Sequence, residues 1–320
     1  KLLANIKKIS TLIYELNNRR FTKVVLVELE RKAREISAHA STSIEGNPLP
    51  LTDVKEILKT HPRHIRDSER EVLNYNEALI ELNSAKKDSL KFDLNLILNI
   101  QKIITLGLLP KIQSGKLRKA PVFVNDPRSG KTIYWPPDDA DVKPLLSELF
   151  AYIQENASVL DPLIIAGIFH KQFVIIHPFI DGNGRTVRLA TKVLLAAVGL
   201  DTFNLFSFEN YYNQNVSQYF KHVGVQGNYY DIKKKIDFTP WLEYFTDGII
   251  DELLRVSKNL QTNSITHERI LQSHHHIILE HIKKHGFITD KIYSTLTQRA
   301  KPTRNQDFNK LIEMDLIERI

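Results

Sequence analysis

The chain contains no cysteine among its 320 residues, which excludes disulfides and thiolate metal sites. Long apolar runs are also missing, because the best candidate for a membrane span, residues 163–180, is interrupted by His170, Lys171 and His177. The first ten residues, KLLANIKKIS, lack the apolar core and the small-residue cleavage site of a signal peptide. From these absences we expect a cytoplasmic protein that does not associate with membranes.

The remaining composition is that of an ordinary globular protein, with 42% hydrophobic and 25% charged residues. The length suits one large domain with one or two small ones. The net charge of +7 is compatible with an anionic partner, such as a nucleotide, a nucleic acid or an acidic protein. A plain basic surface explains the same charge equally well.

Apolar residues recur at helical spacing along most of the chain, which predicts a mainly α-helical fold. Residues 120–137 differ, because two β-rich runs, APVFV and TIYW, flank a turn-rich connector and predict a hairpin. Near the C-terminus, helical patterns are followed by LIER at 316–319, a predicted final strand, which is typical of a winged helix. We therefore expect three regions: N-terminal helices (1–85), a helical core (86–260) and a winged-helix-like domain (263–320).

One stretch, HPFIDGNGRTVR at residues 177–188, concentrates residue types that suit an anion site. Its glycines let the backbone approach a ligand, and the free amides of the helix that follows would face that ligand. Arg185 and Arg188 are three residues apart and share one face of the first helical turn. Asp181 beside a polyphosphate is expected to hold Mg²⁺ between its carboxylate and the phosphates.

His177 opens this stretch. Its ordinary pKa near neutrality suits a general base. For a lone histidine, a buried or capping role is the more common explanation. The neighbouring glycines, carboxylate and arginines favour the catalytic interpretation here.

These residues resemble the signature of the Fic family, His-x-Phe-x-Asp/Glu-Gly-Asn-Gly-Arg-x-x-Arg. Every fixed position is filled, by His177, Phe179, Asp181, Gly182, Asn183, Gly184, Arg185 and Arg188. The resemblance implies a Fic-type helical core that transfers AMP from ATP to a Ser, Thr or Tyr hydroxyl of a target protein, which can be the enzyme itself.

The resemblance also implies roles for the residues. His177 would take the hydroxyl proton, Asp181 would hold Mg²⁺, and Asn183 with the loop amides would stabilise the α-phosphate. Arg185 would grip the β-phosphate and Arg188 the γ-phosphate. The predicted nucleotide site comprises Asp181, Gly182, Asn183, Gly184, Arg185, Thr186, Arg188, Tyr211 and Tyr212, the two tyrosines resembling an adenine-binding pair or, equally, packing in the core.

Two further segments resemble parts of Fic proteins. The predicted hairpin matches the position of the flap that holds the target peptide by strand addition, and its last strand comprises Lys131, Thr132, Ile133 and Tyr134. STSIEGN at 41–47 resembles the inhibitory motif Ser/Thr-x-x-x-Glu-Gly/Asn, with Ser41 and Glu45 at its key positions. The resemblance implies that Glu45 pairs with Arg188 and blocks the γ-phosphate position, so we expect an autoinhibited enzyme.

Other functions stay open at this stage. Glu45 could instead position a water that removes AMP from targets, alone or alongside transfer. The C-terminal region, with Lys301, Arg304 and Lys310, could bind DNA, although we favour target contact or self-association, such as a homodimer. A catalytically dead scaffold is disfavoured by the complete signature.

The run HHH at 274–276 could bind metal, but consecutive helical side chains diverge by about 100°, which leaves exposed polar surface as the alternative.

Overall fold

The computed structural model describes residues 1–18, 23–60, 62, 64–84, 91–126, 129–200, 204–313 and 316–319. The chain divides into two compact units. The first comprises residues 1–17 and 32–254, and the second comprises residues 18–31 and 255–320. The boundary predicted at 85–86 lies outside the described residues. The helix Thr239–Ile270 runs through the boundary predicted at 260–263.

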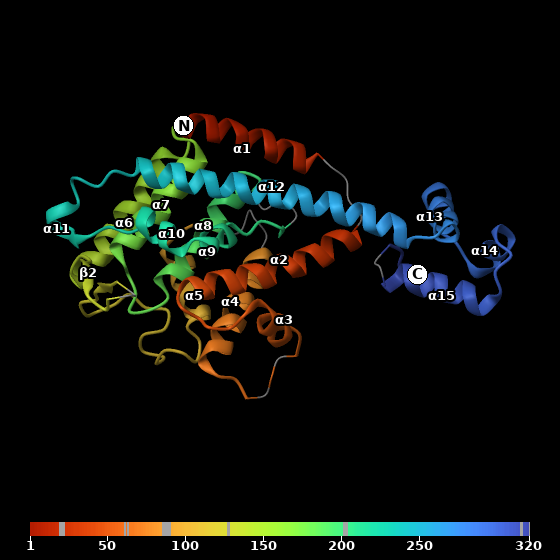
Figure 1. Ribbon diagram of the computed structural model, residues 1–320, viewed down its shortest axis with the longest axis horizontal. Helices are drawn as coiled ribbons and strands as arrows, with labels where there is room; N and C mark the ends of the chain where they lie inside the picture. Colours follow the sequence, from red (N-terminus) through yellow and green to blue (C-terminus); the bar gives the residue numbers. More distant parts are fainter. Residues whose placement is uncertain are drawn as a thin grey trace. The chain divides into compact units, whose positions relative to one another are not determined.

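The described elements are mainly helices, which confirms the predicted fold class (Figure 1). The helices of the N-terminal half are α1 (Leu2–Asn17), α2 (Lys23–Ile44), α3 (Leu51–Thr60), α4 (Asp67–Ser84), α5 (Leu94–Ile104) and α6 (Asp139–Asn156). Those that follow are α7 (Pro162–Ile176), α8 (Asn183–Ala196), α9 (Phe208–Gln214), α10 (Val216–Val223), α11 (Tyr229–Ile232), α12 (Thr239–Ile270), α13 (Ser273–His285), α14 (Asp290–Leu296) and α15 (Lys301–Glu313). No described helix has the length and apolar composition that crossing a membrane requires.

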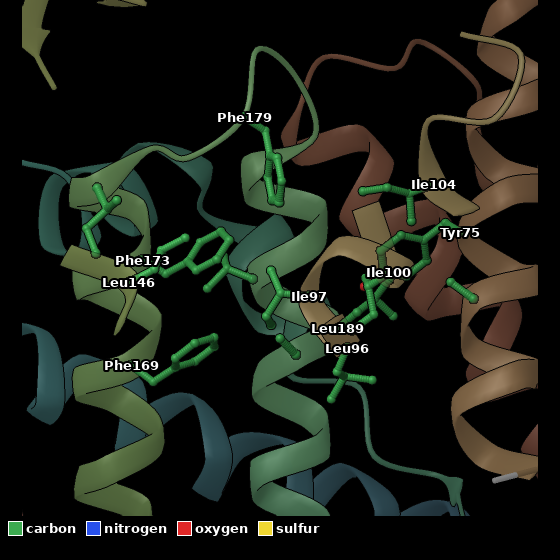
Figure 2. Packing of buried hydrophobic residues seen from close by; sticks show 14 of the residues in the cluster. Tyr75, Leu96, Ile97, Ile100, Ile104, Leu146, Phe169, Phe173, Phe179 and Leu189 are labelled. Carbon is green, nitrogen blue, oxygen red and sulfur yellow. The ribbon is translucent and has the colours of Figure 1, made fainter. Parts of the chain in front are cut away.

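Helix α7 is central to the first unit because it is apolar on nearly all faces and is buried on most of them. Asp161 caps its N-terminus by accepting from the Leu163 amide, and Pro162 occupies the first helical position, where no amide is needed. Helix α8 packs along α7, and the core between them also includes α4, α5 and α6. Figure 2 shows aromatic and aliphatic side chains from these helices converging, with Phe179 entering the core from the loop above.

The hairpin forms as two short antiparallel strands, β1 (Val124–Asn125) and β2 (Thr132–Trp135). A third strand, β3 (Gly227–Asn228), pairs in parallel with β2 and places β2 at the centre of the sheet. Strand β3 could not be predicted from its residues, because glycine and asparagine are both depleted in strands. Tyr134 of β2 donates a hydrogen bond to the Ile175 carbonyl at 2.8 Å, which fastens the hairpin to the end of α7.

The second unit ends differently from the prediction. Residues 316–319 are not a strand, so the final strand of the winged-helix interpretation is missing from the described part of this unit. Helices α13, α14 and α15 pack around Ile278, Tyr293 and Leu311 instead. The run LIER is too short to stay extended without a neighbouring strand to pair with.

Phe179 anchors the loop between α7 and α8, and we expect its replacement by alanine to destabilise the protein strongly. The side chain is fully buried and lies 6.1 Å from Phe173, measured between ring centroids. Removing a buried phenyl ring costs about 3–5 kcal/mol, which chemical denaturation followed by circular dichroism will measure. Phe123→Ala is the matched control, since Phe123 is 56% exposed and should change stability by no more than about 0.5 kcal/mol. Equal effects of the two changes would contradict the anchoring role.

Candidate active site

The loop at residues 177–183 connects α7 to α8 and is held closed by its own side chains. His177 ends α7 in the left-handed conformation, with φ 51° and ψ 60°, and its amide still donates to the Phe173 carbonyl. Asn183 begins α8 and binds Phe179 twice, accepting from its amide and donating to its carbonyl, both at 2.9 Å. The sequence predicted that Asn183 faces the α-phosphate. In the structure, its carboxamide holds the loop through these two hydrogen bonds, and its contact with the α-phosphate stays a prediction.

The two glycines of the loop are required for different reasons. Gly182 has φ 83°, a conformation that favours glycine. Gly184 lies within helix α8 with ordinary helical geometry, so of these two glycines Gly182 alone has a positive φ. A Cβ at Gly184 would collide with the carboxylate of Glu45. The Glu45 carboxylate therefore lies directly over the start of α8, where an anion would approach the free amides.

The position of His177 at the end of α7 determines which of its ring nitrogens can act as a base. Its Nδ1 lies 3.3 Å from the Val174 carbonyl, which can only accept a hydrogen bond. Nδ1 therefore carries the proton in the neutral ring, and Nε2 is the basic nitrogen. Burial lowers the pKa of His177 below its usual 6.5, and the Arg118 charge acts in the same direction. The imidazole is therefore neutral at physiological pH.

Arg185 is held between two carboxylates. Its Nη2 donates to Asp181 Oδ2 at 2.9 Å, and its Nη1 lies 3.1 Å from Glu71 Oε1, close enough for an ion pair but without hydrogen-bond geometry. The side chain is only 3% exposed, and its Nε and Nη1 have no hydrogen-bond acceptor in the part of the chain that the structure describes. Buried donors without acceptors are rare. Of the two, Nη1 is next to the Glu71 carboxylate, which leaves Nε as the Arg185 donor without a nearby carboxylate among the described contacts.

Arg188 is fully buried and is occupied by residues of α2 and the turn after it. Nε donates to Ser41 Oγ at 2.8 Å, and Nη2 donates to the Ser41 carbonyl at 2.8 Å and to Glu45 Oε1 at 2.7 Å. Burial alone would lower the pKa of Arg188, but the charge and hydrogen bond of Glu45, together with Tyr219 and Tyr75, raise the pKa overall. Nη1 of Arg188 has no hydrogen-bond acceptor among the residues described. The contact between Glu45 and Arg188 thus joins residues 143 positions apart in the sequence.

Glu71 is a site residue that the sequence did not suggest. The amide nitrogen of Asn47 donates to its Oε2 at 2.7 Å, while Oε1 faces Arg185. Asn47 is two residues after Glu45, so one turn contacts both site arginines, one directly and one through Glu71. A glutamate within an ordinary helical pattern carries no local signal of such a role, which depends on tertiary contacts alone.

The remaining predicted residues lie around this centre in different ways. Thr186 is fully buried, and its hydroxyl has no hydrogen-bond partner within the described ranges. In the hairpin, Lys131 is exposed, Thr132 and Ile133 are half-buried, and Tyr134 is buried.

The tyrosine pair at 211–212 divides between surface and core. Tyr212 is fully buried between the rings of Tyr219 and Tyr244, at centroid distances of 4.5 and 5.9 Å. Both of its faces are covered, so Tyr212 packs in the core and has no face free for adenine. Tyr211 is half-buried beside Tyr244.

The histidine run in the second unit is exposed polar surface only in part, because His276 is exposed, His274 is half-buried and His275 is buried. His275 is 2% exposed, and its Nδ1 accepts from the Gln272 amide to close the N-terminus of α13. Its Nε2 must then carry the proton, so this nitrogen has no lone pair for a metal. Asp307 lies 3.2 Å from His274 Nε2, but Arg299 already binds it with two hydrogen bonds. The cluster is best explained as a buried polar network.

Comparison with protein-family models and with curated proteins points to the family whose signature residues 177–188 resemble. Residues 91–195 match the sequence model of the Fic/DOC family. The chain is 28% identical over 221 residues to a protein adenylyltransferase Fic of Drosophila virilis, covering 62% of this chain and 43% of that protein. A protein adenylyltransferase Fic of Drosophila grimshawi is 31% identical over 163 residues, covering 50% of this chain and 32% of that protein. The chain thus spans less than half the length of these relatives.

Solved structures share the fold. A Fic family protein from Desulfovibrio desulfuricans superposes with a TM-score of 0.66 at 19% identity, covering 97% of this chain and 89% of that one. Fic-1 from C. elegans gives a TM-score of 0.65 at 21% identity, covering 82% and 74%. A Fic domain containing signaling protein from Bacteroides thetaiotaomicron gives 0.64 at 19% identity, covering 81% and 98%.

Proposed function

We propose that this chain, which belongs to the Fic/DOC family over residues 91–195, is a protein adenylyltransferase that transfers AMP from ATP to a protein hydroxyl. One observation carries the proposal. A neutral histidine and two buried arginines lie at the N-terminus of helix α8, whose first amides are free. Each arginine has a donor without an acceptor among the described residues. Together these groups can bind a polyphosphate and support attack on it.

In the proposed reaction, Nε2 of His177 accepts the proton of the target hydroxyl while the hydroxyl oxygen attacks the α-phosphorus. The new oxygen–phosphorus bond joins AMP to the target, and the bond between the α-phosphorus and the bridging oxygen breaks, so pyrophosphate leaves. The Val174 carbonyl keeps the tautomer and the ring direction that this transfer needs. The free amides at the start of α8 stabilise the charge on the α-phosphate oxygens.

Arg185 and Arg188 would hold the β- and γ-phosphates, whose oxygens would accept from Arg185 Nε and Arg188 Nη1, which have no acceptor among the described residues. Asp181 fits a role as Mg²⁺ ligand, since its carboxylate is half-exposed and is a hard oxygen donor beside the phosphate site. When bound, Mg²⁺ supplies charge neutralisation for the polyphosphate. Arg188 can grip phosphate only after its contact with Glu45 opens, so we propose that the described conformation is autoinhibited.

The pH dependence of transfer should reflect the lowered pKa of His177. The base must be neutral, and a pKa below 6.5 keeps it neutral at pH values where a free imidazole is already protonated. On acidification, we expect kcat/KM to be retained at pH 6.5 and lost only below it. Initial rates between about pH 5 and about pH 8 will locate this limb. A midpoint at or above 6.5 would contradict the assigned environment.

The activity itself is tested by incubating the full chain with a cell lysate and labelled ATP. Label at the α-phosphate should appear on protein bands, whereas label at the γ-phosphate should not, because pyrophosphate is released. Label from the γ-position alone would indicate a kinase instead. Parallel reactions with GTP, UTP and CTP determine the nucleotide preference.

Removal of AMP is a second candidate, favoured by one observation. The Glu45 side chain is 31% exposed and lies over Gly184 at the start of α8, where it could orient a water toward a bound phosphodiester. AMP-modified target incubated with the full chain would then release free AMP.

DNA binding is less well supported, because Arg304 in the second unit is paired with Asp290 through two hydrogen bonds at 2.7 and 3.0 Å.

A further inference from the structure

Arg118 connects three segments that the proposed reaction must hold together. It lies in the loop before β1, is 3% exposed, and donates every described hydrogen bond of its side chain to a backbone carbonyl. Its Nε binds the His177 carbonyl at 2.9 Å, its Nη1 binds the Ala120 carbonyl at 3.2 Å, and its Nη2 binds the Pro137 carbonyl. A buried cation is costly unless such partners compensate it, so the arrangement is specific.

The three carbonyls that accept from Arg118 lie at the two ends of the hairpin and at the turn after α7. Ala120 precedes β1 and Pro137 follows β2, so one guanidinium holds both ends of the hairpin. The His177 carbonyl belongs to the residue in the left-handed conformation that turns the chain out of α7. The amide of Arg118 also donates to the Pro178 carbonyl at 3.0 Å, so two successive carbonyls of that turn bind one residue.

We propose that Arg118 is a positioning residue that fixes the hairpin relative to His177, and so sets the distance between a docked target hydroxyl and the base. The inference rests on the proposed function for its effect on transfer, but the fixing itself is a property of the fold. Arginine suits the task because its planar fork donates in several fixed directions at once. A lysine would keep the charge but could not reproduce the three directions.

Tyr134 supports the same attachment from a second point. Its hydroxyl binds the Ile175 carbonyl, two residues before His177, whereas the contacts of Arg118 are at the ends of the hairpin. Tyr134→Phe removes one hydrogen bond and keeps the ring. This variant therefore measures the contribution of the strand alone, with Arg118 intact.

The first test uses hydrogen exchange in the full chain, read by mass spectrometry. Arg118→Lys should accelerate exchange by about tenfold or more in peptides from 118–137 and 177–180, since charge-assisted hydrogen bonds are lost there. Tyr134→Phe should show a smaller change confined to the hairpin. Arg304→Lys is the matched control, because Arg304 is also partly buried but binds Asp290 in the second unit. Unchanged exchange in the hairpin of Arg118→Lys would overturn the proposal.

The second test separates target positioning from nucleotide binding. In a Glu45→Gly background, Arg118→Lys should leave the Kd for MgATP within about twofold, since Arg118 contacts no arginine of the phosphate site. Transfer to protein should fall about 10- to 100-fold, because the target hydroxyl would be displaced from the base His177. A tenfold loss of MgATP binding would overturn the positioning role. If no variant transfers AMP, the proposed function fails, and hydrogen exchange still decides the role of Arg118.

Discussion

Replacement of His177 by alanine should reduce AMP transfer by about 100- to 10,000-fold, the usual contribution of a general base. The reason is geometric as well as chemical. Nε2 is the only nitrogen of this ring left with a lone pair, because Nδ1 is directed at the Val174 carbonyl. Nothing else in the described loop replaces it at neutral pH, since Asp181 already binds Arg185. Initial rates with ATP labelled at the α-phosphate, in the Glu45→Gly background, measure the loss.

The left-handed backbone at residue 177 calls for a second variant, because alanine is strained there. His177→Asn tolerates that conformation and still lacks a base, so it should lose transfer to the same extent. Both variants should bind MgATP within about threefold of the parent, because no phosphate contact is removed. His276→Ala changes an exposed histidine of α13 and should leave the rate unaltered. Transfer above about a tenth of the parental rate in both His177 variants would exclude His177 as the base.

The parts of the site that could be predicted from the sequence are those whose residues are close together in the chain. His177 to Arg188 form one contiguous stretch, so residue types and helical spacing were sufficient to predict an anion site at a helix N-terminus. Glu45 was recognised only through its resemblance to a motif, since it lies 143 residues from Arg188. Glu71 and Arg118 belong to no motif, and they act through contacts that exist only in the folded chain.

The differences between prediction and structure have the same origin. Strand β3 consists of glycine and asparagine and forms because β2 offers it an edge, not because of its own propensity. His275 is buried because its ring caps α13, although three histidines in succession look like polar surface. Tyr212 is enclosed by Tyr219 and Tyr244, which come from other helices. In each case a neighbour distant in sequence decides the outcome.

Replacement of Glu45 by glycine should raise AMP transfer by about 10- to 100-fold. Arg188 must exchange its 2.7 Å contact with Glu45 for a phosphate, and a charge-assisted hydrogen bond of this kind opposes that exchange by about 1.5–3 kcal/mol. The same change clears the space over Gly184, which the carboxylate now fills. Nucleotide should then reach the amides of α8 unhindered. The measurement is the initial rate of transfer from α-labelled ATP, compared with the parent.

Glu45→Gly should lower the stability of the free protein while it raises AMP transfer. This combination is expected if Glu45 inhibits transfer by holding Arg188. Without Glu45, a fully buried guanidinium loses its carboxylate partner and keeps its hydrogen bonds to Ser41, so the Tm of the free variant should fall. MgATP supplies the missing anion, so it should raise the Tm of Glu45→Gly more than that of the parent.

Two comparisons identify the contact that matters. Glu45→Gln keeps the shape and loses the charge, so it should be intermediate between the parent and Glu45→Gly. Glu71→Gln removes a carboxylate that faces Arg185, 3.1 Å away, and leaves Arg188 restrained. If Glu71→Gln raises transfer as much as Glu45→Gly, the gain comes from the overall charge of the loop and not from freeing Arg188. If Glu45 also positions a water for the removal of AMP, Glu45→Gly should lose that activity while it gains transfer.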